Sequence, residues 1–196
     1  MFNDLRQYYN PNACEYFNCT YTIDLTDIYK KIISHFDNKN SLLLDVGAGS
    51  CRDSKYLASV GYNVVSFDLA VELLKLAAKE YSGKFCNGDM IFLPFKNCIF
   101  DYALANASLL HIAKAQALKV LLEIRRVLKK TGKLYISVKK GEGEGYDERG
   151  RFFAYYSEAE IANILNHADY KIIECSVDES ADNRNIKWIY AIAQKI

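Results

Sequence analysis

The chain has almost no surplus of charge of either sign. Its net charge is +1, from 25 Lys and Arg residues against 24 Asp and Glu residues. A protein with so little net charge has no overall field that would gather nucleic acid or an anionic membrane surface. Any contact with nucleic acid is therefore expected to be local, which disfavours a nucleic-acid partner without excluding one.

Long apolar segments are also missing from the sequence. No run of about 18 apolar residues is present that would cross a bilayer, and no charged and then apolar signal stands at the amino terminus. The sequence therefore predicts a soluble, cytoplasmic protein without a membrane partner.

The cysteines lack the spacings that disulfide or metal sites use. None of the six forms a C-x-x-C pair, and none has metal-ligand spacing with the three histidines. Reduced thiols and no bound metal are the simplest interpretation. Cys86 and Cys175 lie in apolar runs and are expected in the core, whereas Cys51 is expected to be partly exposed.

What the sequence does contain is a glycine turn between an apolar run and a helical segment. Residues 42–46 suit a buried parallel strand, and Gly47 and Gly49 follow at once. Neither glycine has a Cβ atom that would keep a ligand away, and the helix expected from Ser50 onward presents unpaired N–H groups. Asp68 ends the next apolar run and is placed to accept hydrogen bonds from ribose hydroxyls. The pattern predicts a nucleotide site.

One position in this pattern argues against a dinucleotide. A dinucleotide fingerprint needs a third small residue where the helix packs on the strand, and here that residue is Arg52. Length points the same way, because 196 residues suit one domain (1–196), and nicotinamide dehydrogenases usually add a substrate domain.

The turn resembles the first motif of the class I S-adenosylmethionine-dependent methyltransferases. Asp45, Gly47 and Gly49 match its acidic residue and its first two glycines, while Cys51 stands at the third glycine. Asp68 looks like the acid that binds the ribose in this family. Further similarity covers Asn87-Gly88-Asp89-Met90, which resembles the adenine-binding segment, and residues 100–106 and 121–132.

The resemblance implies S-adenosylmethionine as cofactor and S-adenosylhomocysteine as product. It also implies that residues 1–40 form a helical lid on a Rossmann-like core of residues 41–196, with Tyr16 and Thr20 on the methionine part of the cofactor. Tyr8, Tyr9 and Tyr21 either join this lid or pack on the outside of the sheet. The implied cofactor-binding residues are Tyr16, Thr20, Asp45, Gly47, Ala48, Gly49, Arg52, Asp68, Leu69, Asp89, Met90, Asn106 and Ala107.

Alternating apolar runs and helical periods predict an α/β fold. We expect a Rossmann-like, seven-stranded, mostly parallel sheet with helices on both faces and a C-terminal antiparallel hairpin. Gly61 and Gly83 are expected to end two helices in the left-handed conformation, and Ser157 and Glu160 to form a capping box. The expected strands are 42–46, 63–67, 84–86, 99–105, 133–138, 170–177 and 186–193, and the expected helices are 24–36, 52–60, 71–81, 114–130 and 157–167.

Two segments are expected to shape the site of the methyl acceptor. His111, after the fourth strand, is a candidate proton acceptor, with a merely pocket-shaping role as the alternative. In the segment 137–156, Lys139, Glu144 and Arg151 are the charged residues expected to face the acceptor, together with Arg184 from a later loop. Lys and Arg suit a carboxylate or phosphate.

The segment 137–156 allows two interpretations. It is either a mobile solvated loop or a functional cover over the active site, and its aromatic end at 152–156 favours burial. Its Ser-Val-Lys-x-Gly-x-Gly-Glu run and Arg151-x-Phe153 resemble a subgroup of small bacterial methyltransferases, the tellurite-resistance-like type.

The leading hypothesis is a monomeric or homodimeric methyltransferase that acts on a small molecule. A tRNA methyltransferase of the wobble-uridine kind is one alternative, since residues 121–132 resemble that group and carry Arg125, Arg126, Lys129 and Lys130. These charges also follow a helical spacing that suits a solvated face. A protein that binds S-adenosylmethionine without turnover is the other alternative.

Overall fold

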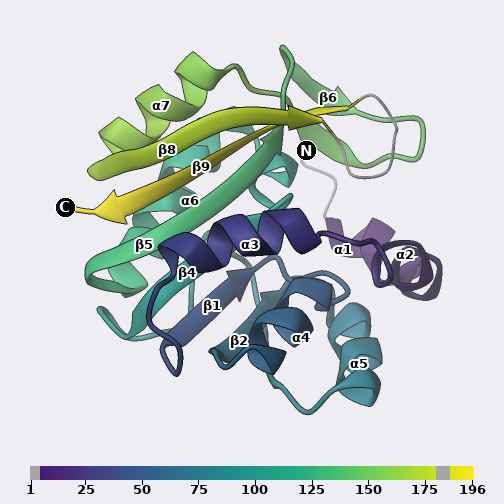
Figure 1. Ribbon diagram of the computed structural model, residues 1–196. Coiled ribbons are helices and arrows are strands. Elements are labelled where there is room, and N and C mark those ends of the chain that lie inside the picture. The colour runs from purple at the N-terminus through teal and green to yellow at the C-terminus, as the bar shows by residue number, and fades with distance from the viewer. Residues whose placement is uncertain (1–4, 180–185) are drawn as a thin grey trace.

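The computed structural model describes residues 5–179 and 186–196 and shows a seven-stranded sheet in the order β3-β2-β1-β4-β5-β9-β8 (Figure 1). The first five strands in this order run parallel, and β9 pairs antiparallel with both β5 and β8. The predicted Rossmann-like sheet with a C-terminal antiparallel hairpin is therefore confirmed. The strands are β1 (Leu42–Val46), β2 (Asn63–Asp68), β3 (Lys84–Asn87), β4 (Phe100–Asn106), β5 (Leu128–Lys139), β8 (Tyr170–Glu179) and β9 (Lys187–Lys195).

Helices cover both faces of the sheet, as Figure 1 shows for α3 in front and α6 behind. On one face, Ile32 of α3 and Leu57 of α4 pack with Leu43 of β1. On the other face, α6 packs on β5, and α7 packs on β8 and β9. The helices are α1 (Leu5–Tyr9), α2 (Ala13–Thr20), α3 (Thr26–His35), α4 (Arg52–Ser59), α5 (Val71–Glu80), α6 (Lys114–Val127) and α7 (Glu158–His167), with a 3₁₀ turn, η1, at Leu109–His111.

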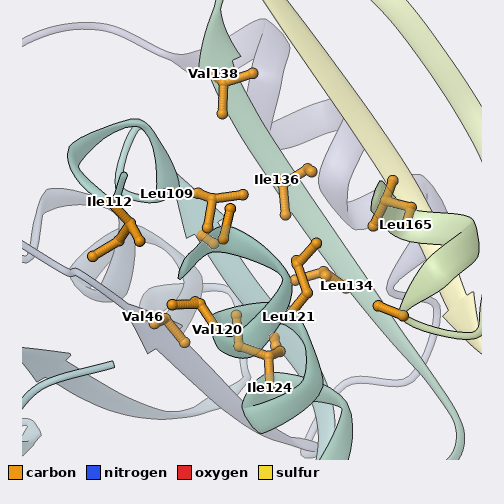
Figure 2. Packing of buried hydrophobic residues seen from close by; sticks show 14 of the residues in the cluster. Val46, Leu109, Ile112, Val120, Leu121, Ile124, Leu134, Ile136, Val138 and Leu165 are labelled. Carbon is orange, nitrogen blue, oxygen red and sulfur yellow. The ribbon is translucent and has the colours of Figure 1, made fainter. Parts of the chain in front are cut away.

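The larger core lies between α6 and the sheet. In Figure 2, Val120, Leu121 and Ile124 of α6 lie against Leu134 and Ile136 of β5. All five side chains are at most 1% exposed. Val120, Leu121 and Ile124 lie on one face of α6 and form a continuous apolar stripe, as the helical period of this segment predicted.

Helix ends are set by local hydrogen bonds, which confirm two sequence predictions and contradict one. Gly61 has φ +107° and follows α4, where the N–H groups of Gly61 and Tyr62 bond back to the carbonyls of Ala58 and Leu57. Ser157 and Glu160 form the predicted capping box of α7. Gly83 is not in the left-handed region, because α5 ends earlier, with Tyr81 in an extended conformation.

The junction between α6 and β5 also differs from the prediction. Helix α6 ends at Val127 and β5 begins at Leu128, so residues 128–130 are strand where a helix was expected. Leu128 pairs with Phe100, and the register shifts before Tyr102 pairs with Lys133. This bulge accommodates Thr131, which has φ +65°. Pairing with β4 therefore overrides the helical pattern of the local sequence.

The segment after β5 forms a small hairpin, whose tip is largely exposed. Strands β6 (Glu144–Tyr146) and β7 (Phe152–Ala154) pair antiparallel. Phe153 and Tyr156 are buried, at 4% and 2% exposure, as the aromatic end of the segment predicted. Within the described ranges, no helix is long and apolar enough to cross a bilayer.

Candidate functional site

The glycine turn after β1 is held tightly against β2. The N–H groups of Gly47 and Ala48 both donate to the carbonyl oxygen of Phe67, at 2.7 and 3.0 Å. Gly47 and Gly49 have φ +76° and +55°, a region that glycine adopts without strain. A Cβ atom on Gly47 would stand 2.4 Å from Cβ of Ser108. The turn therefore has no room for a side chain at Gly47.

Cys51 follows the same turn in the left-handed conformation, with φ +56°. This explains why the resembling family has glycine at this position, since a side chain there costs backbone strain. Cys51 is 0% exposed, so the expectation of a partly exposed thiol is wrong. Its side chain packs with α2 and α5 instead, among Phe17, Leu73 and Ala77.

Asp68 ties the glycine turn to the start of α5. One carboxylate oxygen accepts from the Gly49 N–H at 2.7 Å and the other from the Ala70 N–H at 2.7 Å. Burial raises the pKa of Asp68 from its usual range, and these backbone hydrogen bonds act in the opposite direction. Each oxygen keeps a further lone pair, so the carboxylate is still able to accept from a ligand hydroxyl.

Two cavities meet at the carboxyl edge of the sheet, where the ligand site of an open α/β sheet is expected. A smaller one of about 70 Å³ reaches Asp68, Asp89 and Met90, and a larger one of about 660 Å³ extends under α2 and the β6–β7 hairpin. The residues that line both cavities are Tyr9, Tyr16, Gly47, Gly49, Ala107 and His111.

Almost all residues implied as cofactor-binding line one of these cavities. The smaller cavity includes Asp68, Leu69, Asp89 and Met90. The larger one includes Thr20, Ala48, Arg52 and Asn106, and Tyr16, Gly47, Gly49 and Ala107 line both. The first helices of the chain thus contribute directly to the cavity wall.

Asp45 lines neither cavity. It is 2% exposed, and its carboxylate accepts from the Ser54 hydroxyl at 2.6 Å. Burial raises the pKa of Asp45 to about 8. The structure therefore places Asp45 behind the turn, in a buried hydrogen-bond network, and not in contact with the cavity.

Asp53, which sequence reasoning missed, faces the larger cavity instead. One of its oxygens accepts from Tyr29 and from Arg52, at 2.7 and 2.8 Å, and the other accepts from the Asn106 amide at 2.8 Å. Burial alone would raise the pKa of Asp53, but Arg52 and these hydrogen bonds hold it below its usual value. The sequence could have indicated Asp53, because it is an acidic residue beside Arg52 in the first helical turn after the glycines.

The Asn106 side chain is held by Ser137 as well as by Asp53. The Ser137 hydroxyl donates to the Asn106 side-chain oxygen at 2.6 Å, and the Ala107 N–H donates to the Ser137 oxygen at 2.9 Å. Since the amide oxygen accepts from Ser137, the amide nitrogen faces Asp53. The cavity floor is therefore a rigid polar surface with a fixed negative charge at Asp53.

His111 lies where the two cavities meet. Its Nδ1 atom is 2.8 Å from the Phe152 carbonyl oxygen, and its Nε2 atom is 3.1 Å from the Tyr9 hydroxyl. Burial, with the charges of Arg151 and Lys139, lowers the pKa of His111 to about 4. The imidazole is therefore neutral at pH 7.

The charged residues predicted for the acceptor separate into two groups. Lys139 and Arg151 line the larger cavity and flank the Phe153 ring, with Nζ 3.9 Å and Cζ 5.1 Å from the ring centroid. Glu144 does not face this cavity, because its carboxylate accepts from the Lys114 N–H at the start of α6. A carboxylate at a helix N-terminus is stabilised by the helix dipole. Arg184 lies outside the described residues.

The far wall of the larger cavity comes from β9. Because β9 runs antiparallel to β5, Trp188 pairs with Lys139 and Tyr190 pairs with Ser137. Both aromatic side chains line the cavity. This side of the cavity therefore combines aromatic side chains with Lys139 and with Arg151, which forms an ion pair with Asp147 at 2.6 Å.

The chain is similar to known methyltransferases in sequence over about half of its length. Residues 44–136 match the family model described as a methyltransferase domain. An uncharacterized protein of Methanocaldococcus jannaschii is 36% identical over 108 residues, and a demethylmenaquinone methyltransferase of Renibacterium salmoninarum is 32% identical over 96 residues. These matches cover 55% and 48% of this chain but 45% and 40% of those proteins, so the chain spans less than half of their length.

A solved structure shares the whole fold. It is the Burkholderia thailandensis 1,6-didemethyltoxoflavin-N1-methyltransferase with bound 1,6-didemethyltoxoflavin and S-adenosylhomocysteine. The TM-score is 0.83 at 22% identity, and the match covers 97% of this chain and 87% of that one. The similarity therefore extends over the helices before β1 and the hairpin after α7.

Proposed function

We propose that the chain is a class I S-adenosylmethionine-dependent methyltransferase that transfers a methyl group from S-adenosylmethionine to a small-molecule acceptor, because residues 44–136 match the family model of a methyltransferase domain. The observation that carries the proposal is the junction of two cavities at the glycine turn. The lining of the smaller cavity offers polar and apolar contacts for the adenosine part of the cofactor, and the larger cavity has room for an acceptor. Methyl transfer needs such a shared boundary.

The residues present fit the cofactor. Gly47 lines both cavities with bare backbone because a side chain there would collide with Ser108, and Asp68 has lone pairs left for ribose hydroxyls. Ser108 lines the smaller cavity with a buried hydroxyl that has no hydrogen-bond partner among the described residues. A buried polar atom without a partner costs free energy, which a ligand contact would recover. Asp89 and Met90 are the proposed adenine contacts.

The other end of the cofactor is proposed to lie over the Asp53 network. Arg52 suits a carboxylate and Asp53 an ammonium group, which are the two charges of a methionine tail. Tyr16 and Thr20, from the proposed lid (residues 5–40), close this part from above. The cofactor supplies an electrophilic methyl group, and the protein contributes orientation and exclusion of water.

The acceptor is proposed to be a small aromatic or apolar molecule with an anionic group. The aromatic side chains Phe153, Trp188 and Tyr190 supply the apolar walls, and Lys139 and Arg151 supply positive charge. A small-molecule acceptor is also present beside S-adenosylhomocysteine in the Burkholderia structure. The tRNA alternative gains no support, because Arg125, Arg126 and Lys129 bond to neighbouring parts of the chain.

Calorimetric titration of the purified protein with S-adenosylmethionine, S-adenosylhomocysteine and NAD tests the cofactor. We expect the first two to bind and NAD not to bind, because Arg52 replaces the small residue of a dinucleotide site. Folded protein that binds neither adenosyl ligand would contradict the proposal. A protein that binds both but transfers no label from methyl-tritiated S-adenosylmethionine would be a non-catalytic binder.

Lys139→Ala and Arg151→Ala test the acceptor site. Each change removes a charge that a carboxylate or phosphate would contact, so we expect the KM for the acceptor to rise about tenfold or more per variant. Cofactor affinity should change much less, because neither residue lines the smaller cavity and the groups proposed for the methionine tail are Arg52 and Asp53. Glu144→Ala is the matched control, since its carboxylate lies outside the cavity. Unchanged acceptor affinity and turnover in both cavity variants would refute the assignment.

A further inference from the structure

Both ring nitrogens of His111 are already engaged by other groups of the chain. A carbonyl oxygen only accepts hydrogen bonds, so the nitrogen that faces Phe152, Nδ1, carries the proton of the neutral ring. Nε2 is then the acceptor, and the Tyr9 hydroxyl donates to it. An acceptor molecule in the cavity would therefore meet the hydroxyl of Tyr9 before it could reach Nε2.

The Tyr9 hydroxyl is placed at the boundary of the two cavities. Among the residues that line both, the polar side chains are Tyr9, Tyr16 and His111. The described residues supply the Tyr9 hydroxyl with one hydrogen-bond partner, His111. Its proton points to Nε2, so the lone pairs of its oxygen remain to accept a hydrogen bond from a bound molecule.

We propose that Tyr9 and His111 form a proton relay, which restricts the acceptor to molecules whose methylated atom carries a proton, as O–H or N–H. This rests on the methyl transfer proposed above. As the acceptor atom bonds to the methyl carbon, the sulfonium sulfur keeps the electron pair of the broken carbon–sulfur bond. The acceptor's proton passes to the Tyr9 oxygen, and the Tyr9 proton passes to Nε2. The resulting imidazolium releases one proton to water.

The charges around the relay fit an anionic acceptor. His111 is faced by Arg151 and Lys139, which lower its pKa, by Asp147, which raises it, and by the neutral Tyr9. Burial raises the pKa of Tyr9 far above its usual value, so Tyr9 passes protons without holding a charge. A carboxylate or phosphate bound beside Lys139 and Arg151 offsets their charges and raises the proton affinity of His111. The relay is therefore strongest when an anionic acceptor is bound.

Tyr9→Phe removes the relay and keeps the ring. The assay uses methyl-tritiated S-adenosylmethionine and a deproteinised small-molecule extract of the native host cells. At pH 7 we expect the rate of label transfer to fall roughly 100-fold, a typical contribution of general base catalysis. The loss should shrink as the pH rises, because an acceptor that has ionised by itself needs no relay. Affinity for S-adenosylhomocysteine should fall far less than the rate, because Tyr9→Phe keeps the ring that lines the smaller cavity and packs on Tyr16.

Two further measurements separate a relay from a structural effect. The double variant Tyr9→Phe/His111→Ala should transfer label no more slowly than either single variant. The effects of two residues that act as one unit do not add. Nitrogen-15 spectra of the ligand-free protein should show Nδ1 of His111 protonated and Nε2 not, with the Nε2 signal shifted in Tyr9→Phe. Tyr155→Phe, which removes a hydroxyl outside the cavity lining, is the matched control.

The possible outcomes are distinct. If Tyr9→Phe transfers label as fast as the wild-type protein, the relay is overturned. It is also overturned if the slower label transfer of Tyr9→Phe does not recover at high pH. Spectra with the proton on Nε2 would also overturn it. If the unchanged protein binds S-adenosylmethionine but labels no compound in the extract, methyl transfer itself is refuted, and the relay is refuted with it.

Discussion

Replacing Asp68 by Ala is expected to weaken the binding of S-adenosylmethionine and S-adenosylhomocysteine roughly 100-fold, which corresponds to about 2.7 kcal/mol. The carboxylate accepts from the Gly49 and Ala70 N–H groups, both at 2.7 Å. The change therefore removes the proposed ribose contact and also releases the glycine turn. Calorimetric titration of the folded variant with both ligands measures the effect.

A surface acid provides the control for this change. Asp27 on α3 pairs with Lys30, and its side chain is 94% exposed, so Asp27→Ala removes the same charge far from the turn. Its affinity for both ligands should equal that of the unchanged protein. If Asp68→Ala is folded by circular dichroism and binds as tightly as Asp27→Ala, Asp68 has no part in the cofactor site.

Gly47→Ala is expected to lower the free energy of unfolding by roughly 2–5 kcal/mol and to abolish cofactor binding. Two costs add at this position: a left-handed φ of +76° and a new Cβ atom that would stand 2.4 Å from Cβ of Ser108. Ser108 is buried and the backbone of Gly47 is hydrogen-bonded to Phe67, so neither atom moves without shifting backbone. Urea unfolding and ligand titration measure the two losses separately.

Gly143 offers a matched control with the same backbone strain. Its φ is +74°, and a Cβ atom there would meet nothing within 4 Å. Gly143→Ala therefore carries the strain alone, about 1–2 kcal/mol, and leaves the cofactor site unchanged. Equal stability of the two variants would show that the contact with Ser108 relaxes at no cost.

Much of the sheet was predictable because each strand of its core is a short apolar run between turn residues. Residues 42–46 were predicted with the bounds that β1 has in the structure. The error at residues 128–130 has a definite cause. Leu128-Lys129-Lys130 continues the pattern of α6, and pairing with β4, which is distant in sequence, decides its conformation.

The candidate site shows the same division between local and distant causes. The glycine turn and Asp68 follow from one strand-turn-helix pattern, so local sequence was enough to find them. The partners of His111 were not predictable, because Tyr9 stands 102 residues earlier and Phe152 stands 41 residues later in the chain. Glu144 was misplaced because the hairpin that turns it toward α6 has no local signature.

The position of β9 after β5 in the chain sets the order in which the walls of the cavity are made during synthesis. The glycine turn, Asp68 and His111 are all translated before β5. Trp188 and Tyr190, which form the opposite wall, are translated after β5 and then pair with its end. A nascent chain thus carries the groups proposed for the cofactor long before it encloses a space for the acceptor.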